Sequence, residues 1–124
     1  MNLNQVTVAC SDVARSVAFY KRLGLQQIVD SPHYARFACP VGGATFSVHL
    51  APDGVVSSTT VVYFEVEELD VVVGELQSAG VAFDQLPQDE RWLWREARLR
   101  DPDGNQICLY WAGENRLNPP WRID

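Results

Sequence analysis

The sequence predicts an α+β fold in which one βαβββ unit occurs twice in tandem. Landmarks of the first half recur 56 positions later, so that Gly24 corresponds to Gly80 and Asp12 corresponds to Glu68. Each half also has the same order of features: an alternating strand, a capped helix that ends at glycine, and further strands. Two copies are too few for a solenoid. We therefore expect a pseudo-twofold α+β domain; a ferredoxin-like domain would need fewer strands and would leave the common offset unexplained.

The first half begins with a strand over residues 3–10, where the side chains alternate between two faces. Ser11 and Asp12 then supply a helix N-cap. Cations near a helix C-terminus and a glycine just beyond it are typical of a helix end, so Lys21, Arg22 and Gly24 predict a helix over residues 12–23. Turns rich in proline and glycine separate three further strands, at residues 25–30, 34–39 and 44–50.

The second half repeats this order. A strand rich in β-branched and aromatic residues is predicted over residues 60–66. Glu67, Glu68 and Asp70 place negative charge at the start of the next helix, where the helix dipole favours it, and Gly80 marks its end. Strands follow at residues 81–86, 92–100 and 106–111, with a turn at residues 101–104 before the last of them.

Composition limits the possible partners. The chain has 124 residues, a formal net charge of −6 and 47% apolar residues, which is enough to bury a core. An acidic surface repels phosphate backbones and anionic lipid, and no apolar run is long enough for a membrane helix. We expect no nucleic-acid or membrane partner. No basic stretch precedes an apolar one at the N-terminus, so we expect a cytoplasmic protein without a signal peptide.

Three cysteines, Cys10, Cys39 and Cys108, occur without a CxxC pair. An odd number without metal-finger spacing predicts free thiols in a reducing compartment.

Several stretches resemble the vicinal oxygen chelate superfamily, which includes glyoxalase I, the bleomycin-resistance proteins and the extradiol dioxygenases. They are Ser11-Asp12 after a strand, Ser16-x-x-Phe19-Tyr20, Leu23-Gly24, Gly42-Gly43, and Asp101-Pro102-Asp103-Gly104-Asn105. The resemblance implies two βαβββ modules that form a curled, cup-shaped mixed sheet with the helices on its outer face. The modules would be residues 1–56 and 57–112 of a single domain, followed by an aromatic and proline-bearing tail at residues 113–124.

The same resemblance implies a divalent metal inside the cup, held by two residues of each module. The corresponding positions here are Gln5, His49, Val61 and Cys108. Valine cannot bind a metal, and a thiolate beside an amide oxygen mixes soft and hard donors. A catalytic zinc site normally has three protein ligands. We therefore expect no metal cofactor, and keep a divalent metal on Gln5, His49 and Cys108 as the alternative.

Alternation along the strands predicts which other side chains face the cup. Thr7, Tyr63 and Tyr110 share faces with the metal positions, and Glu96 and Arg98 point the same way if Ala97 and Leu99 face the helix. Arg98 would need a partner, either Glu65 or Glu96 or an anionic ligand. The residues expected to bind a substrate are Gln5, Thr7, Tyr63, Arg98, Cys108 and Tyr110.

His49 is the first candidate for metal-free acid–base catalysis, because its ordinary pKa lies near neutrality, and Glu65 is the second. Three functions remain open from the sequence: a small-molecule binding protein without metal, a metal-free enzyme using His49 and Glu65, and a metal-dependent lyase, isomerase or dioxygenase.

The tail carries Pro119, Pro120 and Trp121, and three more tryptophans lie in the last third of the chain. The tail could close one mouth of the cup, pack on a partner chain or cover the edge of its own sheet. The resemblance also implies a homodimer.

Overall fold

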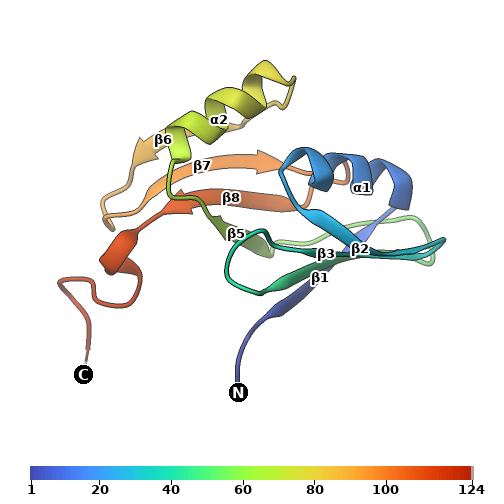
Figure 1. Ribbon diagram of the computed structural model, residues 1–124, viewed down its shortest axis with the longest axis horizontal. Coiled ribbons are helices and arrows are strands. Elements are labelled where there is room, and N and C mark those ends of the chain that lie inside the picture. The colour runs from blue at the N-terminus through green and yellow to red at the C-terminus, as the bar shows by residue number, and fades with distance from the viewer. Residues whose placement is uncertain (124) are drawn as a thin grey trace. The chain divides into compact units, whose positions relative to one another are not determined.

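The computed structural model describes residues 1–123, which form two compact units. Unit 1 comprises residues 1–58 and 101–105, and unit 2 comprises residues 59–100 and 106–123. The elements follow the predicted order (Figure 1): β1 Gln5–Cys10, α1 Val13–Arg22, β2 Gln26–Ser31, β3 Tyr34–Ala38, β4 Thr45–Leu50, β5 Val61–Glu65, α2 Leu69–Ser78, β6 Gln85–Asp89, β7 Arg95–Arg100, β8 Gln106–Trp111 and the 3₁₀ helix η1 Gly113–Arg116. This confirms the α+β class and the tandem βαβββ pattern.

Unit 1 is a four-stranded mixed sheet in the order β1-β4-β3-β2, with α1 packed on one face. The parallel pair β1–β4 lies beside the antiparallel pairs β4–β3 and β3–β2. Tyr20 of α1 is fully buried, and its ring contacts Phe37 of β3 and Phe46 of β4. The helix therefore covers the face that carries Phe37 and Phe46, and the alternate side chains of each strand lie on the other face.

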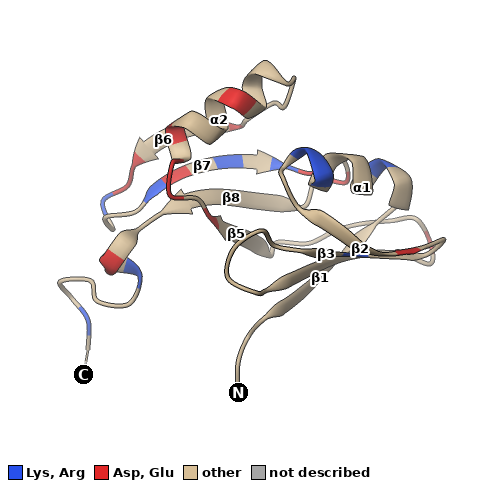
Figure 2. Ribbon diagram, viewed as in Figure 1, with Lys and Arg blue, Asp and Glu red and all other residues tan. Residues whose placement is uncertain are grey.

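Unit 2 has the same topology, with the strand order β5-β8-β7-β6. The buried residues Ala97, Leu99, Ile107 and Leu109 alternate with the polar and aromatic side chains of β7 and β8. Arg95 shares the strand face of Ala97 and Leu99 and forms an ion pair with Asp70 of α2, so α2 covers that face. Figure 2 shows basic positions along β7 and acidic positions along α2.

Helix capping agrees with the sequence in α1. The Asp12 side chain accepts a hydrogen bond from the backbone N–H of Arg15 at 3.0 Å, and Gly24 has a φ of 101°, which favours glycine. The sixth strand differs. Residues 81–86 were expected, but β6 begins at Gln85 and includes Pro87, because it is an edge strand, where a residue without an N–H is tolerated.

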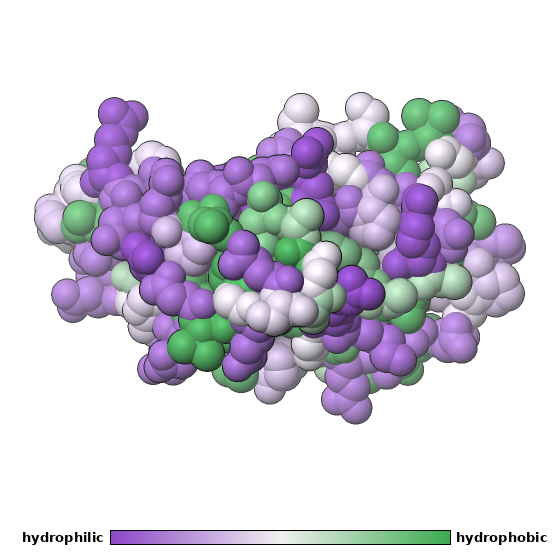
Figure 3. Space-filling model, turned by 90° about the horizontal axis from the view of Figure 1, so that it is seen from above, coloured by the Kyte–Doolittle hydropathy of each residue, from purple (hydrophilic) through white to green (hydrophobic). Residues whose placement is uncertain are grey.

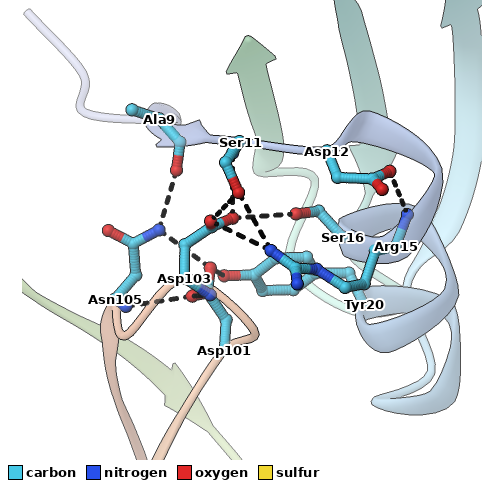
Figure 4. A network of polar contacts seen from close by, with 9 residues as sticks. All are labelled: Ala9, Ser11, Asp12, Arg15, Ser16, Tyr20, Asp101, Asp103 and Asn105. Carbon is cyan, nitrogen blue, oxygen red and sulfur yellow. Dashed lines mark hydrogen bonds and ion pairs between the residues drawn. The ribbon is translucent and has the colours of Figure 1, made fainter. Parts of the chain in front are cut away.

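The turn between β7 and β8 belongs to unit 1 and is held there by a polar network (Figure 4). The buried Asp101 carboxylate accepts a 2.6 Å hydrogen bond from the Tyr20 hydroxyl and a 2.8 Å bond from the Asn105 side chain. Asp103 accepts a bond from the Ser11 backbone N–H and forms an ion pair with Arg15 at 3.3 Å. The Asp-Pro-Asp-Gly-Asn motif therefore joins this turn to the start of α1.

The polarity of the surface and the state of the cysteines agree with the composition of the sequence. Hydrophilic residues occupy most of the face shown in Figure 3, with separate hydrophobic groups among them. Within residues 1–123, neither helix has the length and apolar character needed to span a bilayer. Cys10, Cys39 and Cys108 are all free, as predicted.

Candidate functional site

Each sheet has one face that its helix does not cover, and every predicted site residue lies on one of these two faces. We call them the open face of unit 1 and the open face of unit 2. Strand pairing places Gln5, Thr7, Ser47, His49, Tyr34 and Arg36 on the open face of unit 1. It places Val61, Tyr63, Glu65, Glu96, Arg98, Cys108 and Tyr110 on the open face of unit 2.

On the open face of unit 1, hydrogen bonds join β1 to β4. The Gln5 side-chain amide donates to Ser47 Oγ at 2.8 Å and to Thr7 Oγ1 at 3.1 Å. The Thr45 hydroxyl donates to Gln5 Oε1. Both ends of the Gln5 amide are therefore satisfied within the protein.

A tyrosine continues this chain of hydrogen bonds. The Tyr34 hydroxyl lies 2.6 Å from Ser47 Oγ and accepts a 2.8 Å hydrogen bond from Arg36 Nε. The Arg36 guanidinium also lies over the Tyr34 ring, 5.4 Å from its centre. The bond with Ser47, and then the bond and charge of Arg36, lower the pKa of Tyr34 below that of an ordinary phenol.

His49 is exposed, and its ring lies edge-on to that of Tyr34, with 6.4 Å between the ring centres. In the parallel pair, Gln5 lies opposite Thr45 and His49 lies opposite Ala9. At roughly 3.3 Å per residue, this offset separates Gln5 and His49 by about 13 Å along the strands. Thr45 and Ser47, and not His49, are the β4 residues that contact the Gln5 side chain.

The open face of unit 2 is aromatic. Trp94 and Tyr110 are stacked with ring centres 4.7 Å apart, and Tyr63 contacts both rings edge-on, at 5.9 and 5.6 Å. Trp94 Nε1 donates to the backbone oxygen of Asn115 in η1, so the tail contacts this aromatic group. Tyr63 remains 44% exposed, which leaves part of the group open to a ligand.

Glu96 holds the polar part of this face together. It is buried, and its carboxylate accepts a 2.7 Å bond from Arg98 and another from Trp92 Nε1. Arg98 also donates to the Tyr63 hydroxyl at 3.2 Å and lies over the Tyr63 ring. Glu96 is therefore the partner that Arg98 required, whereas Glu65 is half-exposed and lies 3.9 Å from Arg116.

The predicted metal positions do not fit a metal. Val61 has no donor atom, and Gln5 and His49 are too far apart to share an ion. Burial, together with the nearby Glu96 carboxylate, raises the pKa of the Cys108 thiol to about 12. Among residues 1–123, no three His, Cys, Asp or Glu side chains lie in a group suited to an ion.

Four residues of these faces were not expected from the sequence: Ser47, Tyr34, Arg36 and Trp94. Strand alternation could have predicted the face of Tyr34 and Arg36, because these two residues alternate with the apolar Ala35 and Phe37. The position of Ser47 beside Gln5 follows from the β1–β4 register, which no local pattern reveals.

The model of the Glyoxalase/Bleomycin resistance protein/Dioxygenase superfamily matches residues 2–109. The chain belongs to this superfamily. An uncharacterised protein of Bacillus subtilis (strain 168), YraH, is 31% identical over 129 aligned positions, which cover 89% of this chain and 98% of YraH. The resemblance inferred from the sequence motifs is thereby confirmed.

Solved structures of the superfamily have the same fold. A glyoxalase/bleomycin resistance protein/dioxygenase from Nocardioides matches with a TM-score of 0.76 and 21% identity, over 100% of this chain and 90% of its own. A bleomycin-binding protein in complex with bleomycin matches with a TM-score of 0.72 and 18% identity, over 90% of this chain and 98% of its own. At these identities the likeness concerns the fold.

Proposed function

We propose that this protein binds a small, planar organic molecule on the open face of unit 2 and does so without a metal. The observation that carries the proposal is the aromatic group of Tyr63, Trp94 and Tyr110. This group lies on the same strand face as Val61 and Cys108, two of the positions where the family resemblance implies metal ligands. Aromatic rings in contact with a flat ligand contribute affinity beyond the area they bury.

The charge on this face indicates the class of ligand. Glu96 neutralises Arg98 at 2.7 Å, so the Arg98 charge adds little attraction for a free anion. Cys108 adds no charge near neutral pH, because burial raises the pKa of its thiol to about 12. An uncharged conjugated ring system fits this combination best, with the Tyr63 hydroxyl as a polar contact.

The superfamily contains a protein solved in complex with bleomycin, which supports a binding role for this fold. The metal-dependent lyase, isomerase or dioxygenase is disfavoured by the donors themselves, because Val61 has no donor atom and Gln5 and His49 lie too far apart to share an ion. A homodimer is proposed from the family resemblance.

Binding is tested with N-phenyl-1-naphthylamine, a neutral aromatic probe whose fluorescence rises on binding. We expect a saturable signal from the wild type and an affinity about fivefold lower in Trp94→Ala and Tyr110→Ala, since one aromatic contact contributes about 1 kcal/mol. Trp121→Ala, an exposed tail residue, is the matched control. Equal affinities in the wild type and both ring variants would refute the proposal.

Native mass spectrometry of the protein as isolated tests the metal and the oligomer together. We expect a dimer and less than about one-tenth of an equivalent of any transition metal per chain. A stoichiometric metal that survives purification would favour the metal-dependent alternative.

A further inference from the structure

Residues 113–123, which we call the tail strap, are held together mainly by bonds within the segment itself. They begin with η1, and the backbone N–H of Asn118 donates to the Glu114 carbonyl at 2.8 Å. The Arg122 guanidinium then donates to the Leu117 carbonyl at 3.2 Å and to the Asn118 side chain. These bonds brace the tail strap as one piece.

The tail strap meets the sheet of unit 2 through weak contacts. Within the described part of the chain, two polar contacts join them, and we call these the latch. Trp94 Nε1 donates to the Asn115 carbonyl at 3.3 Å, and Arg116 lies 3.9 Å from Glu65. The hydrogen bond is long for an N–H donor. Both side chains of the ion pair are about half exposed, and such pairs contribute little to stability.

A glycine lies where the tail strap leaves the sheet. Ala112 is buried in the same cluster as Tyr110 and fixes the chain just after β8. Gly113 follows with a φ of 55°, in the left-handed region that favours glycine. Hinges are formed by a few residues at the ends of elements that absorb changes in φ and ψ. Gly113 is therefore placed to act as the hinge of the tail strap.

The latch lies beside the rings that the proposed function uses. Glu65 is paired with Tyr110 across β5–β8, and Trp94 is stacked on Tyr110. Tyr110 is only 7% exposed, whereas Tyr63, which takes no part in the latch, is 44% exposed. With the latch closed, a ligand can reach Tyr63 but little of Tyr110.

We propose that the tail strap is an autoinhibitory element that competes with the small-molecule ligand for the Trp94–Tyr110 ring pair. The inference rests on the proposed binding function and adds its regulation. The ligand binds the fraction of molecules in which the latch is open, so closure lowers the apparent affinity in proportion to that fraction. Salt screens exposed charges and therefore opens the latch.

Stopped-flow fluorescence with N-phenyl-1-naphthylamine tests this competition, because the uncharged probe is not itself attracted by Arg116. We expect Arg116→Met to raise the association rate constant about two- to fivefold and to leave the dissociation rate constant unchanged. Raising NaCl from about 0.02 M to about 0.5 M should have the same effect on the wild type but not on Arg116→Met. Arg91→Met, at an exposed arginine of unit 2 outside the tail strap, is the matched control.

Two results would overturn the competition. Association rates equal to the wild type in Arg116→Met would show that the latch does not limit access to the rings. Unchanged association with faster dissociation would show that the tail strap retains bound ligand instead of competing with it.

Exchange of the two charges separates the latch from a general effect on the fold. Arg116→Glu places two carboxylates together and should accelerate association at least as much as Arg116→Met. Adding Glu65→Arg to the same chain restores an opposite pair and should return the rate to within about twofold of the wild type. A double variant as fast as Arg116→Glu alone would contradict the latch.

Exchange of the Trp94 indole proton with water tests the latch without a ligand. NMR measures this exchange, and loss of the resonance in Trp94→Phe identifies it. We expect exchange about two- to fivefold faster in Arg116→Met and in the wild type at high salt. Trp92, whose indole donates to Glu96, is the internal control and should not change.

The exchange measurement also separates the two proposals. Exchange at Trp94 that responds neither to Arg116→Met nor to salt would overturn the tail strap as a movable element. A wild type that binds no probe but shows salt-dependent exchange at Trp94 would refute the binding function while supporting the opening of the latch.

Discussion

At the scale of single residues, buried polar groups with assigned partners distinguish the two open faces. Glu96 is 1% exposed, a position that a carboxylate occupies only when it is paired. Its partners Arg98 and Trp92 both lie on its own strand or just before it, so β7 carries a complete polar group. Ser47 on β4 is also fully buried, but its hydroxyl is hydrogen-bonded to the less buried hydroxyl of Tyr34.

Cys108 predicts a dependence of stability on alkaline pH. Its folded pKa of about 12 lies above the ordinary thiol value of 9.0, so the native state binds the proton more tightly than the unfolded state. Stability from this group is complete below about pH 9 and is lost as pH rises toward 12. Cys108→Ala should reduce the loss by up to about 1.4 kcal/mol per pH unit in that range, measured by urea unfolding. Parallel pH profiles for the variant and the wild type would contradict this.

At the scale of elements, the two helices differ in how they begin. The Asp12 side chain caps α1, whereas Glu68 makes no side-chain cap hydrogen bond at the start of α2. The two positions correspond in the repeat, so the first copy has a capping interaction that the second lacks.

This difference predicts unequal effects of the same substitution. Asp12→Ala should destabilise the protein by about 1 kcal/mol, because it leaves the Arg15 N–H without its partner. Glu68→Ala should cost only about 0.3–0.5 kcal/mol, the contribution of a charge near the helix dipole. Denaturant unfolding of both variants provides the comparison, and equal losses would show that the Asp12 cap contributes nothing.

Elements were predictable where the pattern is local. The eight strands and two helices follow from alternation, capping residues and glycines, and β8 has the bounds expected for it. The start of β6 was not predictable, because Val81 is apolar like a strand residue but packs in the core before the strand begins. Strand alternation was enough to predict that Tyr63, Cys108 and Tyr110 share one face of β5 and β8. The hydrogen bonds that join Gln5, Ser47 and Tyr34 were not predictable, because they depend on β4 lying between β1 and β3.

At the scale of the whole chain, the two units are not two consecutive stretches of sequence. Residues 101–105 lie in unit 1, although the strands on either side of them belong to unit 2. The chain therefore passes between the units at three places. The Tyr20–Asp101 hydrogen bond joins residues 101–105 to α1 within unit 1.

This connection predicts that a change in unit 1 is detected by reporters in unit 2. Tyr20→Phe removes a buried hydrogen bond to Asp101 and should cost about 1–3 kcal/mol. All four tryptophans, Trp92, Trp94, Trp111 and Trp121, lie in unit 2. We expect the tryptophan fluorescence transition in urea to shift with Tyr20→Phe. A transition at the wild-type midpoint would mean that the units unfold independently.

The placement of the Asp101–Asn105 turn also decides how the chain can be divided into fragments. A fragment that stops at Ser58 would contain every strand of the first repeat but would leave the Tyr20 hydroxyl buried without Asp101 and the Ala9 carbonyl without the Asn105 side chain. Restoring these contacts would require the complementary half to be supplied in trans, as in split-protein reassembly. The two copies of the repeat are thus not equivalent, since the first copy needs residues 101–105, which lie in the sequence of the second copy.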